Sequence, residues 1–105
     1  MHKYKDLERN YKIIKKFAIR YRKELTVYHG AIAELCGEVS CSDYVKFMNN
    51  LSDGEFVGNM FGALLVPHSI KIFKQILDGK KDFDSFITEY LPDDARIIYN
   101  VNISK

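Results

Sequence analysis

The stretch IAELCGEVSCSDYVKFMNNL, residues 32–51, holds both cysteines of the chain around a single glycine. Residues 31–36 have the composition of a short helix, and Gly37 is a natural end for it because glycine adopts left-handed conformations without strain. Ser40 and Ser42 are both candidate N-caps for a second helix. One face of that second helix is apolar and carries Tyr44, Phe47, Met48 and Leu51. The stretch therefore predicts two helices joined by a tight turn.

The segment before this stretch is predicted to be one long basic helix over residues 3–25. Apolar residues recur at alternating steps of three and four, as on one helix face: Tyr4, Leu7, Tyr11, Ile14, Ala18, Tyr21 and Leu25. The outer side of the same helix is basic, with Lys5, Arg9, Lys12, Lys16 and Lys23. β-Branched and aromatic residues follow, and then Gly30, so we expect the helix to break within residues 26–30.

Three further helices and then a strand are predicted downstream. Ser52 or Asp53 can cap the first helix, Pro67 fits the first turn of the second, and Asp82 can cap the third. The period of the pattern then changes from about four residues to two. In this last segment every second residue is a bulky apolar one: Ile97, Tyr99, Val101 and Ile103. This alternation predicts a C-terminal β-strand over residues 96–104.

The whole pattern predicts a mainly α-helical fold: one domain over residues 1–105, built as a small bundle of five to six helices with a C-terminal strand. A chain of 105 residues with 47% hydrophobic residues can bury a core of its own. No apolar run approaches the roughly 20 residues of a membrane span, and the N-terminus is too polar for a signal peptide. We therefore expect a cytoplasmic protein with no membrane contact.

A lone C-terminal strand would need a neighbour for its backbone hydrogen bonds. One candidate is the β-prone segment 25–28. The other is the same strand of a second copy, which would make the protein a homodimer.

Charge is distributed unevenly along the chain, although the net charge is only +2. Residues 1–24 contain nine lysines and arginines against three acids, whereas residues 25–105 contain seven against eleven. Such a basic arm indicates a polyanionic or acidic partner. A solvated helix face gives the same pattern.

The sequence contains no recognisable catalytic or metal-binding pattern. Cys36 and Cys41 have four residues between them, and a zinc site would need two further ligands, for which only His29 and His68 are plausible. The histidines lack the spacing of a metal pair or of a nucleophile and its base, and there is no phosphate-binding glycine loop. We therefore expect a non-enzymatic protein without metal or cofactor, in which both thiols are buried as small apolar groups.

Read as helix, turn and helix, residues 31–51 resemble the helix-turn-helix of phage-repressor-type (Cro and lambda-repressor-like) transcription regulators. Ala33 and Gly37 match the small helix residue and the turn glycine of that family. The apolar residue before Ser40, and Ser40 itself, resemble the pair that opens the second helix. The resemblance extends over about residues 13–66.

The resemblance implies a DNA-binding transcriptional regulator whose second helix enters the major groove of duplex DNA. The side chains implied to contact bases are Ser42, Lys46, Asn49 and Asn50. Contacts with phosphates, or with an acidic partner protein, would come from Lys5, Arg9, Lys12, Lys16, Arg20 and Lys23. Regulators of this type also dimerise. A DNA-binding surface of this kind should place Lys12, Lys16 and Arg20 on the same side as Lys46 and Asn49.

A second class of function fits the same residues. In a plain helical bundle Gly37 is only a helix end, and the protein would be a protein-binding inhibitor, an immunity-type partner or an adaptor. Its contact surface would then be rich in tyrosine, a common interface anchor. Four tyrosines fall on one stripe, namely Tyr4, Tyr11, Tyr21 and Tyr28. The same stripe would equally suit the edge of the protein's own core.

Overall fold

The computed structural model describes the backbone of residues 2–65 and 70–105, and the side chains of residues 8–64 and 70–105. Within these ranges the chain forms seven α-helices and no strand. They are α1 (His2–Arg20), α2 (Arg22–Leu35), α3 (Cys41–Asn49), α4 (Asp53–Leu65), α5 (Ile70–Leu77), α6 (Phe83–Tyr90) and α7 (Asp93–Ile103). The predicted mainly helical fold is confirmed, but the expected number of five to six helices is wrong. Pro67 and His68 lie outside the described residues.

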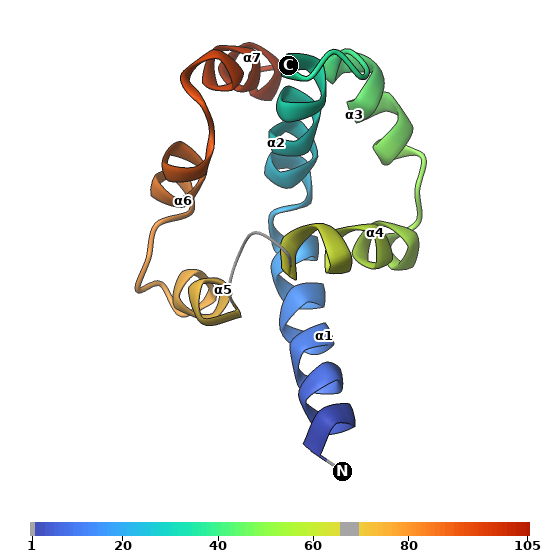
Figure 1. Cartoon of the computed structure of the whole chain (residues 1–105), viewed down its shortest axis with the longest axis vertical. Coiled ribbons are helices and arrows are strands. Elements are labelled where there is room, and N and C mark those ends of the chain that lie inside the picture. Colours follow the sequence, from blue (N-terminus) through green and yellow to red (C-terminus); the bar gives the residue numbers. More distant parts are fainter. Residues whose placement is uncertain (1, 66–69) are drawn as a thin grey trace.

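Helices α1 and α2 follow one another as a bent rod, and the other helices are arranged around this rod (Figure 1). Helices α4 and α5 pack against α1, whereas α3 and α7 pack against α2 and against each other. Helix α6 lies between α5 and α7 in the chain. None of the described helices is long and apolar enough to cross a membrane.

The rod bends at Tyr21, whose backbone angles are φ −113° and ψ 29°. Helical hydrogen bonds continue on both sides of the bend, because the Tyr21 N–H donates to the Phe17 carbonyl at 3.0 Å and the Leu25 N–H to the Tyr21 carbonyl at 2.8 Å. The Tyr21 ring stacks on Phe83, with 4.1 Å between the ring centroids. The predicted helix over residues 3–25 is therefore two helices that meet at residue 21.

The break expected within residues 26–30 is wrong, because all five residues lie inside α2. The Thr26 hydroxyl is satisfied within the helix, where it donates to the Arg22 carbonyl at 2.7 Å. Val27, Tyr28 and Gly30 are buried among α2's neighbours. Packing therefore outweighs the weak helix propensity of these residues, which amounts to only about 0.5 to 1 kcal/mol each.

The core is built around Phe17 of α1, which joins this helix to α5 and α6. Its ring lies 4.6 Å from Phe73 of α5, and 5.9 Å and 6.1 Å from Phe83 and Phe86 of α6, between centroids. Phe17, Phe73 and Phe86 are fully buried. Offset and edge-on ring pairs of this kind contribute about 0.5 to 1.5 kcal/mol each beyond the area that they bury.

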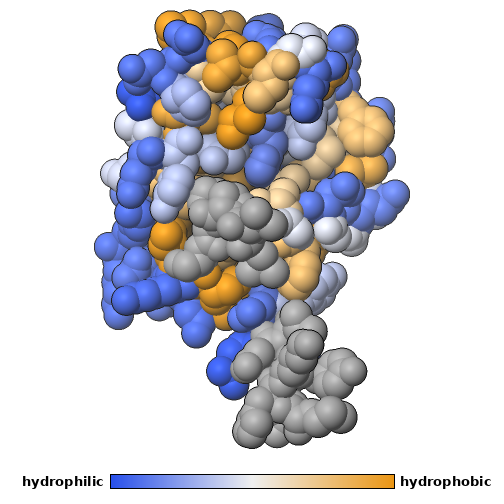
Figure 2. All heavy atoms as spheres, viewed as in Figure 1, coloured by the Kyte–Doolittle hydropathy of each residue, from blue (hydrophilic) through white to orange (hydrophobic). Residues whose placement is uncertain are grey.

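The strand predicted over residues 96–104 is wrong, because this segment forms most of α7. The apolar residues that alternate in sequence are divided unequally in the helix: Tyr99 is buried, while Ile97 and Val101 are 65% and 57% exposed. Figure 2 accordingly shows apolar side chains at the surface over α7. Pro92 precedes the helix and two acids occupy its first turn, and these are signals for the start of a helix. The argument for strand pairing, within the chain or between two copies, does not hold.

Three predicted N-caps are confirmed. The Ser40 hydroxyl accepts from the Asp43 N–H at 3.1 Å, and the Asp82 carboxylate accepts from the Ser85 N–H at 3.1 Å. Ser52 caps α4 and exchanges hydrogen bonds with Glu55, of 3.2 Å and 3.1 Å, as a capping box. The Ser52 groups also hold the pKa of the Glu55 carboxyl below its usual value.

Tyr99 should make the protein sensitive to alkali. Burial, together with the Glu24 and Asp84 carboxylates, raises the pKa of the Tyr99 phenol from 10.0 to about 12. Below pH 10 the phenol is neutral in both states. Between pH 10 and 12 the unfolded chain loses a proton that the folded protein keeps, so the free energy of unfolding falls as the pH rises.

We expect Tyr99→Phe to reduce this alkaline loss, as measured by urea unfolding at a series of pH values. Tyr28 and Tyr44, whose pKa values are also raised by burial, will keep part of it. The same pH dependence in the variant as in the parent protein would contradict the assignment.

Candidate nucleic-acid and partner interface

The turn between α2 and α3 is fixed by local hydrogen bonds that the sequence makes possible. Gly37 has a φ of 76°, and the Glu38 N–H donates to the Ala33 carbonyl at 3.0 Å. The Glu34 carboxylate reaches across the turn and accepts from the Cys41 N–H at 2.9 Å. These bonds satisfy the end of α2 and the start of α3 together. The helix, turn and helix expected over residues 31–51 are present, although α2 begins earlier, at residue 22.

Helices α2 and α3 approach closely at Gly30. A Cβ atom at this position would lie 2.9 Å from the Cys41 sulfur and 3.2 Å from the Tyr44 ring. The Cys41 thiol is fully buried and lies 3.7 Å from the Val27 carbonyl oxygen. The sequence prediction placed the small residue of this crossing at Ala33. In the structure Gly30 is the residue that makes room for α3, because glycine has no side chain.

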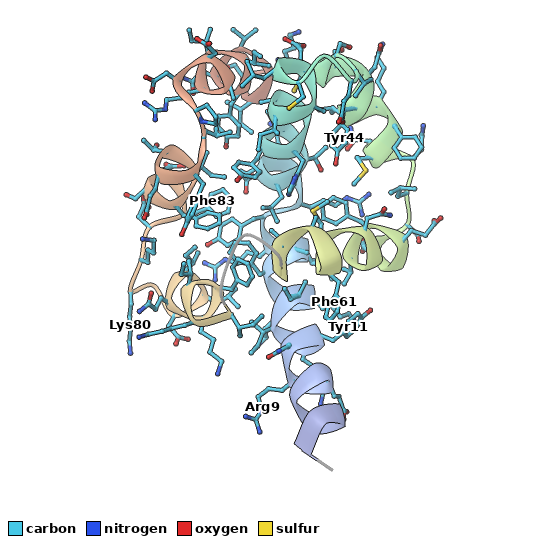
Figure 3. All side chains as sticks on the ribbon, in the orientation of Figure 1. Arg9, Tyr11, Tyr44, Phe61, Lys80 and Phe83 are labelled. Atoms are coloured by element: carbon cyan, nitrogen blue, oxygen red, sulfur yellow. The ribbon has the colours of Figure 1, made fainter. Side chains whose placement is uncertain are left out.

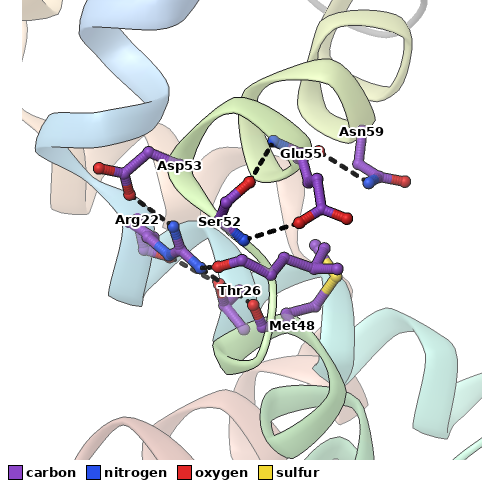
Figure 4. Close-up of polar contacts among 8 residues, drawn as sticks. Arg22, Thr26, Met48, Ser52, Asp53, Glu55 and Asn59 are labelled. Carbon is purple, nitrogen blue, oxygen red and sulfur yellow. Dashed lines mark hydrogen bonds and ion pairs between the residues drawn. The ribbon is translucent and has the colours of Figure 1, made fainter.

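Arg22 holds the far end of α3 in place (Figure 4). Its guanidinium donates to the Met48 carbonyl at 3.0 Å, in the last turn of α3, and to the Leu51 carbonyl at 2.7 Å, two residues past the end of that helix. It also donates to the Asp53 carboxylate at 2.7 Å, and it covers the Phe56 ring at 4.6 Å from the centroid. A cation at a helix C-terminus is favoured by the helix dipole. Arg22 is therefore a structural residue, and no sequence pattern singled it out.

Beside α3 lies a cleft of about 480 Å³, which we call the α3 cleft. Side chains from three helices line it: Lys23, Thr26 and Val27 of α2; Ser42, Val45, Lys46 and Asn49 of α3; and Asn102 of α7 with Lys105 just beyond it. Three of the four predicted base-contact residues thus meet in one place, with one predicted phosphate contact. Among the described residues that line the cleft there are three lysines and no carboxylate side chain. The fourth residue, Asn50, is exposed but does not line the cleft.

A second depression lies between α1 and α5, and we call it the α1–α5 groove. Its volume is about 810 Å³. The residues that line it are Lys12, Ile13, Lys15, Lys16, Ile19 and Arg20 of α1, with Lys74, Leu77 and Asp78 at α5. Sequence reasoning missed Lys15 and Lys74. Of the remaining predicted contacts, Arg9 is exposed near the lower end of α1 (Figure 3), and the side chain of Lys5 is outside the described residues.

The predicted contact residues are therefore divided between two depressions. Lys12, Lys16 and Arg20 line the α1–α5 groove, whereas Lys46 and Asn49 line the α3 cleft. The four cations and the asparagine that a DNA-binding surface was expected to bring together do not meet in one site, so the residues around the α3 cleft are the remaining candidates for DNA contact. The two sites also differ in their uncharged lining: two isoleucines and a leucine line the groove, whereas a serine, a threonine, two asparagines and two valines line the cleft.

The tyrosine stripe is not a single exposed surface. Tyr28 is buried, and Tyr21 stacks on Phe83 in the core. Tyr11 is 41% exposed but lies against Phe61 of α4, with 5.6 Å between the ring centroids. Figure 3 shows these two rings together on the α4 side of α1. The described tyrosines of this stripe therefore contribute mainly to packing within the protein.

The two cysteines lie in different environments, which corrects the expectation that both are buried. Cys41 is buried and Cys36 is exposed. Burial, with the nearby Glu34 carboxylate, raises the pKa of the Cys41 thiol. In the part of the chain that the structure describes, no group of three or more histidine, cysteine or acidic side chains could hold a metal ion.

Comparisons with known proteins give no further guide to the function. No protein-family model, no curated protein and no solved structure matches this chain. The assignment of the site rests on the geometry of its residues.

The two thiols should react at very different rates. Because the thiolate is the reactive form, exposed Cys36 should react promptly with dithionitrobenzoate, and Cys41 only when the protein unfolds. Cys36→Ala should abolish the fast phase, whereas Cys41→Ser should leave it unchanged. Prompt reaction of both thiols in the folded protein would contradict the packing of α3 on α2.

Proposed function

We propose that the protein binds duplex DNA, with α3 as its recognition helix. One observation carries the proposal: Ser42, Lys46 and Asn49 line a single cleft with Lys23 and Lys105. Amide and hydroxyl groups are the side chains that pair with base edges, and lysine pairs with guanine or phosphate.

The candidate DNA contacts lie on one side of α3 and just beyond its end. Ser42, Lys46 and Asn49 line the cleft, and all three side chains are exposed, so that they can reach base edges in a major groove. Asn50 is exposed directly after α3 and does not line the cleft. A DNA strand that runs beside α3 would lie over this cleft, where Lys23 and Lys105 neutralise its phosphates.

The fold supports the role of a recognition helix. The N-terminus of α3 is capped by Ser40 and packs against Gly30 of α2, and its C-terminus is held by Arg22. A helix fixed at both ends presents its outer residues in one geometry, and base readout requires this. Asp43 is also exposed on α3. Because a carboxylate repels phosphate, the lysines of the cleft must supply much of the affinity.

Binding to a labelled pool of random duplex DNA, measured by fluorescence anisotropy at several salt concentrations, tests the proposal. We expect the affinity to fall steeply as salt increases, because counterions are released from the DNA. Lys23→Ala should weaken binding to all sequences and reduce the slope of log K against log salt by about 0.9. Asn49→Ala should instead reduce the preference between sequences selected from the pool.

Lys80→Ala is the matched control for the loss of charge. Lys80 is exposed after α5, on the opposite side of the molecule from α3 (Figure 3). The Lys80→Ala substitution should leave the affinity for duplex DNA and its salt dependence unchanged. The absence of binding at low salt, or equal effects of Lys23→Ala and Lys80→Ala, would refute the proposal.

A further inference from the structure

The α1–α5 groove combines a cationic rim with an apolar floor. The rim consists of Lys12, Lys15, Lys16 and Arg20 of α1 and Lys74 of α5. Asp78 is the one acid among the described residues that line the groove. Within the described residues Lys12 pairs with Glu8 at 3.8 Å, with both side chains largely exposed, whereas the other four cations have no ion pair. The groove therefore presents an excess of unpaired positive charge.

The floor is formed by Ile13, Ile19 and Leu77. Ile13 and Leu77 are half-buried, and Ile19 is 43% exposed. A nucleic-acid backbone or a free anion would pair with the rim but would gain nothing from three aliphatic side chains. An occupant with both carboxylates and apolar side chains satisfies the whole groove.

The shape of the groove favours a helix as the occupant. Helices α1 and α5 pack against each other, and the surface between two packed helices accepts the ridge of side chains on a third. The apolar side chains lie among lysines and an arginine that come from both helices. A helix seated between α1 and α5 can bring apolar side chains onto half-buried Ile13 and Leu77 and carboxylates onto the cations at the same time.

We propose that the α1–α5 groove binds an acidic amphipathic helix of a partner protein. Apolar side chains at positions i, i+3, i+4 and i+7 of that helix pack on Ile13, Ile19 and Leu77. Its flanking carboxylates pair with the rim, above all with Lys16 and Arg20. This site is separate from the α3 cleft and does not depend on DNA binding there.

A second copy of the chain is the competing occupant that the structure itself offers. The outer side of α7 carries exposed Asp94, Ile97 and Val101, which share one face by their spacing of three and four. Such a contact would join different surfaces of two copies and would produce a mass that rises with concentration. A partner helix leaves the isolated protein monomeric.

The probe is a fluorescent synthetic peptide of about 15 residues, or four helical turns. Its apolar face carries leucines at the spacing given above, and its other positions are glutamate. Two matched peptides replace the leucines by serine or the glutamates by lysine. We expect the 105-residue chain to bind the first peptide and neither of the other two, as measured by anisotropy.

Two variants separate the floor from the rim. Ile19→Ser and Lys16→Glu should each weaken peptide binding by about tenfold or more. Ile97→Ser and Lys80→Glu are the matched controls at exposed positions away from the groove, and they should leave the binding unchanged. All four positions are exposed, so circular dichroism should show an unaltered helix content.

Four outcomes would overturn the proposal. One is no binding of the acidic leucine peptide, and another is full binding by the Ile19→Ser variant, which would make the groove a purely electrostatic site. A third is binding to phosphatidylserine vesicles that Ile19→Ser abolishes, which would assign the groove to a membrane surface. The fourth is a concentration-dependent mass in light scattering that both Ile19→Ser and Ile97→Ser abolish, which would assign it to a second copy.

Discussion

The guanidinium of Arg22 is the contact that joins the rod of α1 and α2 to α3 and α4. It lies at the first residue of α2, directly after the bend at Tyr21, and it binds two carbonyl oxygens at the end of α3 and the Asp53 carboxylate at the start of α4. One side chain therefore fixes the rod to the link between two of the helices that pack around it. The side chain is only 22% exposed, so these charge-assisted hydrogen bonds are shielded from most of the solvent.

Arg96 repeats this arrangement at the link between α6 and α7. Its guanidinium donates to the carbonyls of Thr88 and Leu91, at 3.0 Å and 3.4 Å, and pairs with the Asp93 carboxylate at 3.5 Å. In both links a leucine carbonyl is followed two residues later by the paired aspartate. An arginine thus supplies donors to helix-end carbonyls where the chain turns sharply into the next helix. The two links lie at the end of α3 and the start of α7, and these two helices line the α3 cleft together with α2.

Much of the fold was predictable where the determinants are local. Glycine turns and the caps Ser40, Ser52 and Asp82 follow from the chemistry of a few adjacent residues, and all three caps are confirmed. Hydrophobic periodicity and helix propensity gave wrong predictions of secondary structure where tertiary contacts decide the conformation. Gly30 predicts a break in isolation, but in the fold it is the space that α3 requires. The alternation after residue 96 resembles a strand because α7 leaves Ile97 and Val101 exposed.

The candidate sites were predictable only in part, for the same reason. Helical spacing places Ser42, Lys46 and Asn49 on one side of α3, and the structure brings them together. Lys105 and Lys74 are distant in sequence from the residues that they join, so no local pattern could have identified them. The basic stripe of the first helix was visible in the sequence. The apolar floor of the α1–α5 groove was not visible in the sequence, because Leu77 comes from α5 and only the packing of α5 on α1 forms the groove.

Urea unfolding of Arg22→Ala beside Asp53→Asn tests most directly whether the Arg22 contacts hold the fold together. Two carbonyl hydrogen bonds from a charged donor predict a loss of about 2 to 4 kcal/mol in the free energy of unfolding for Arg22→Ala. The Asp53 carboxylate is 71% exposed, so Asp53→Asn should cost less than about 1 kcal/mol. Arg9→Ala, at an exposed position on α1, should cost little. A loss below about 1 kcal/mol for Arg22→Ala, or an equal loss for Asp53→Asn, would contradict this account.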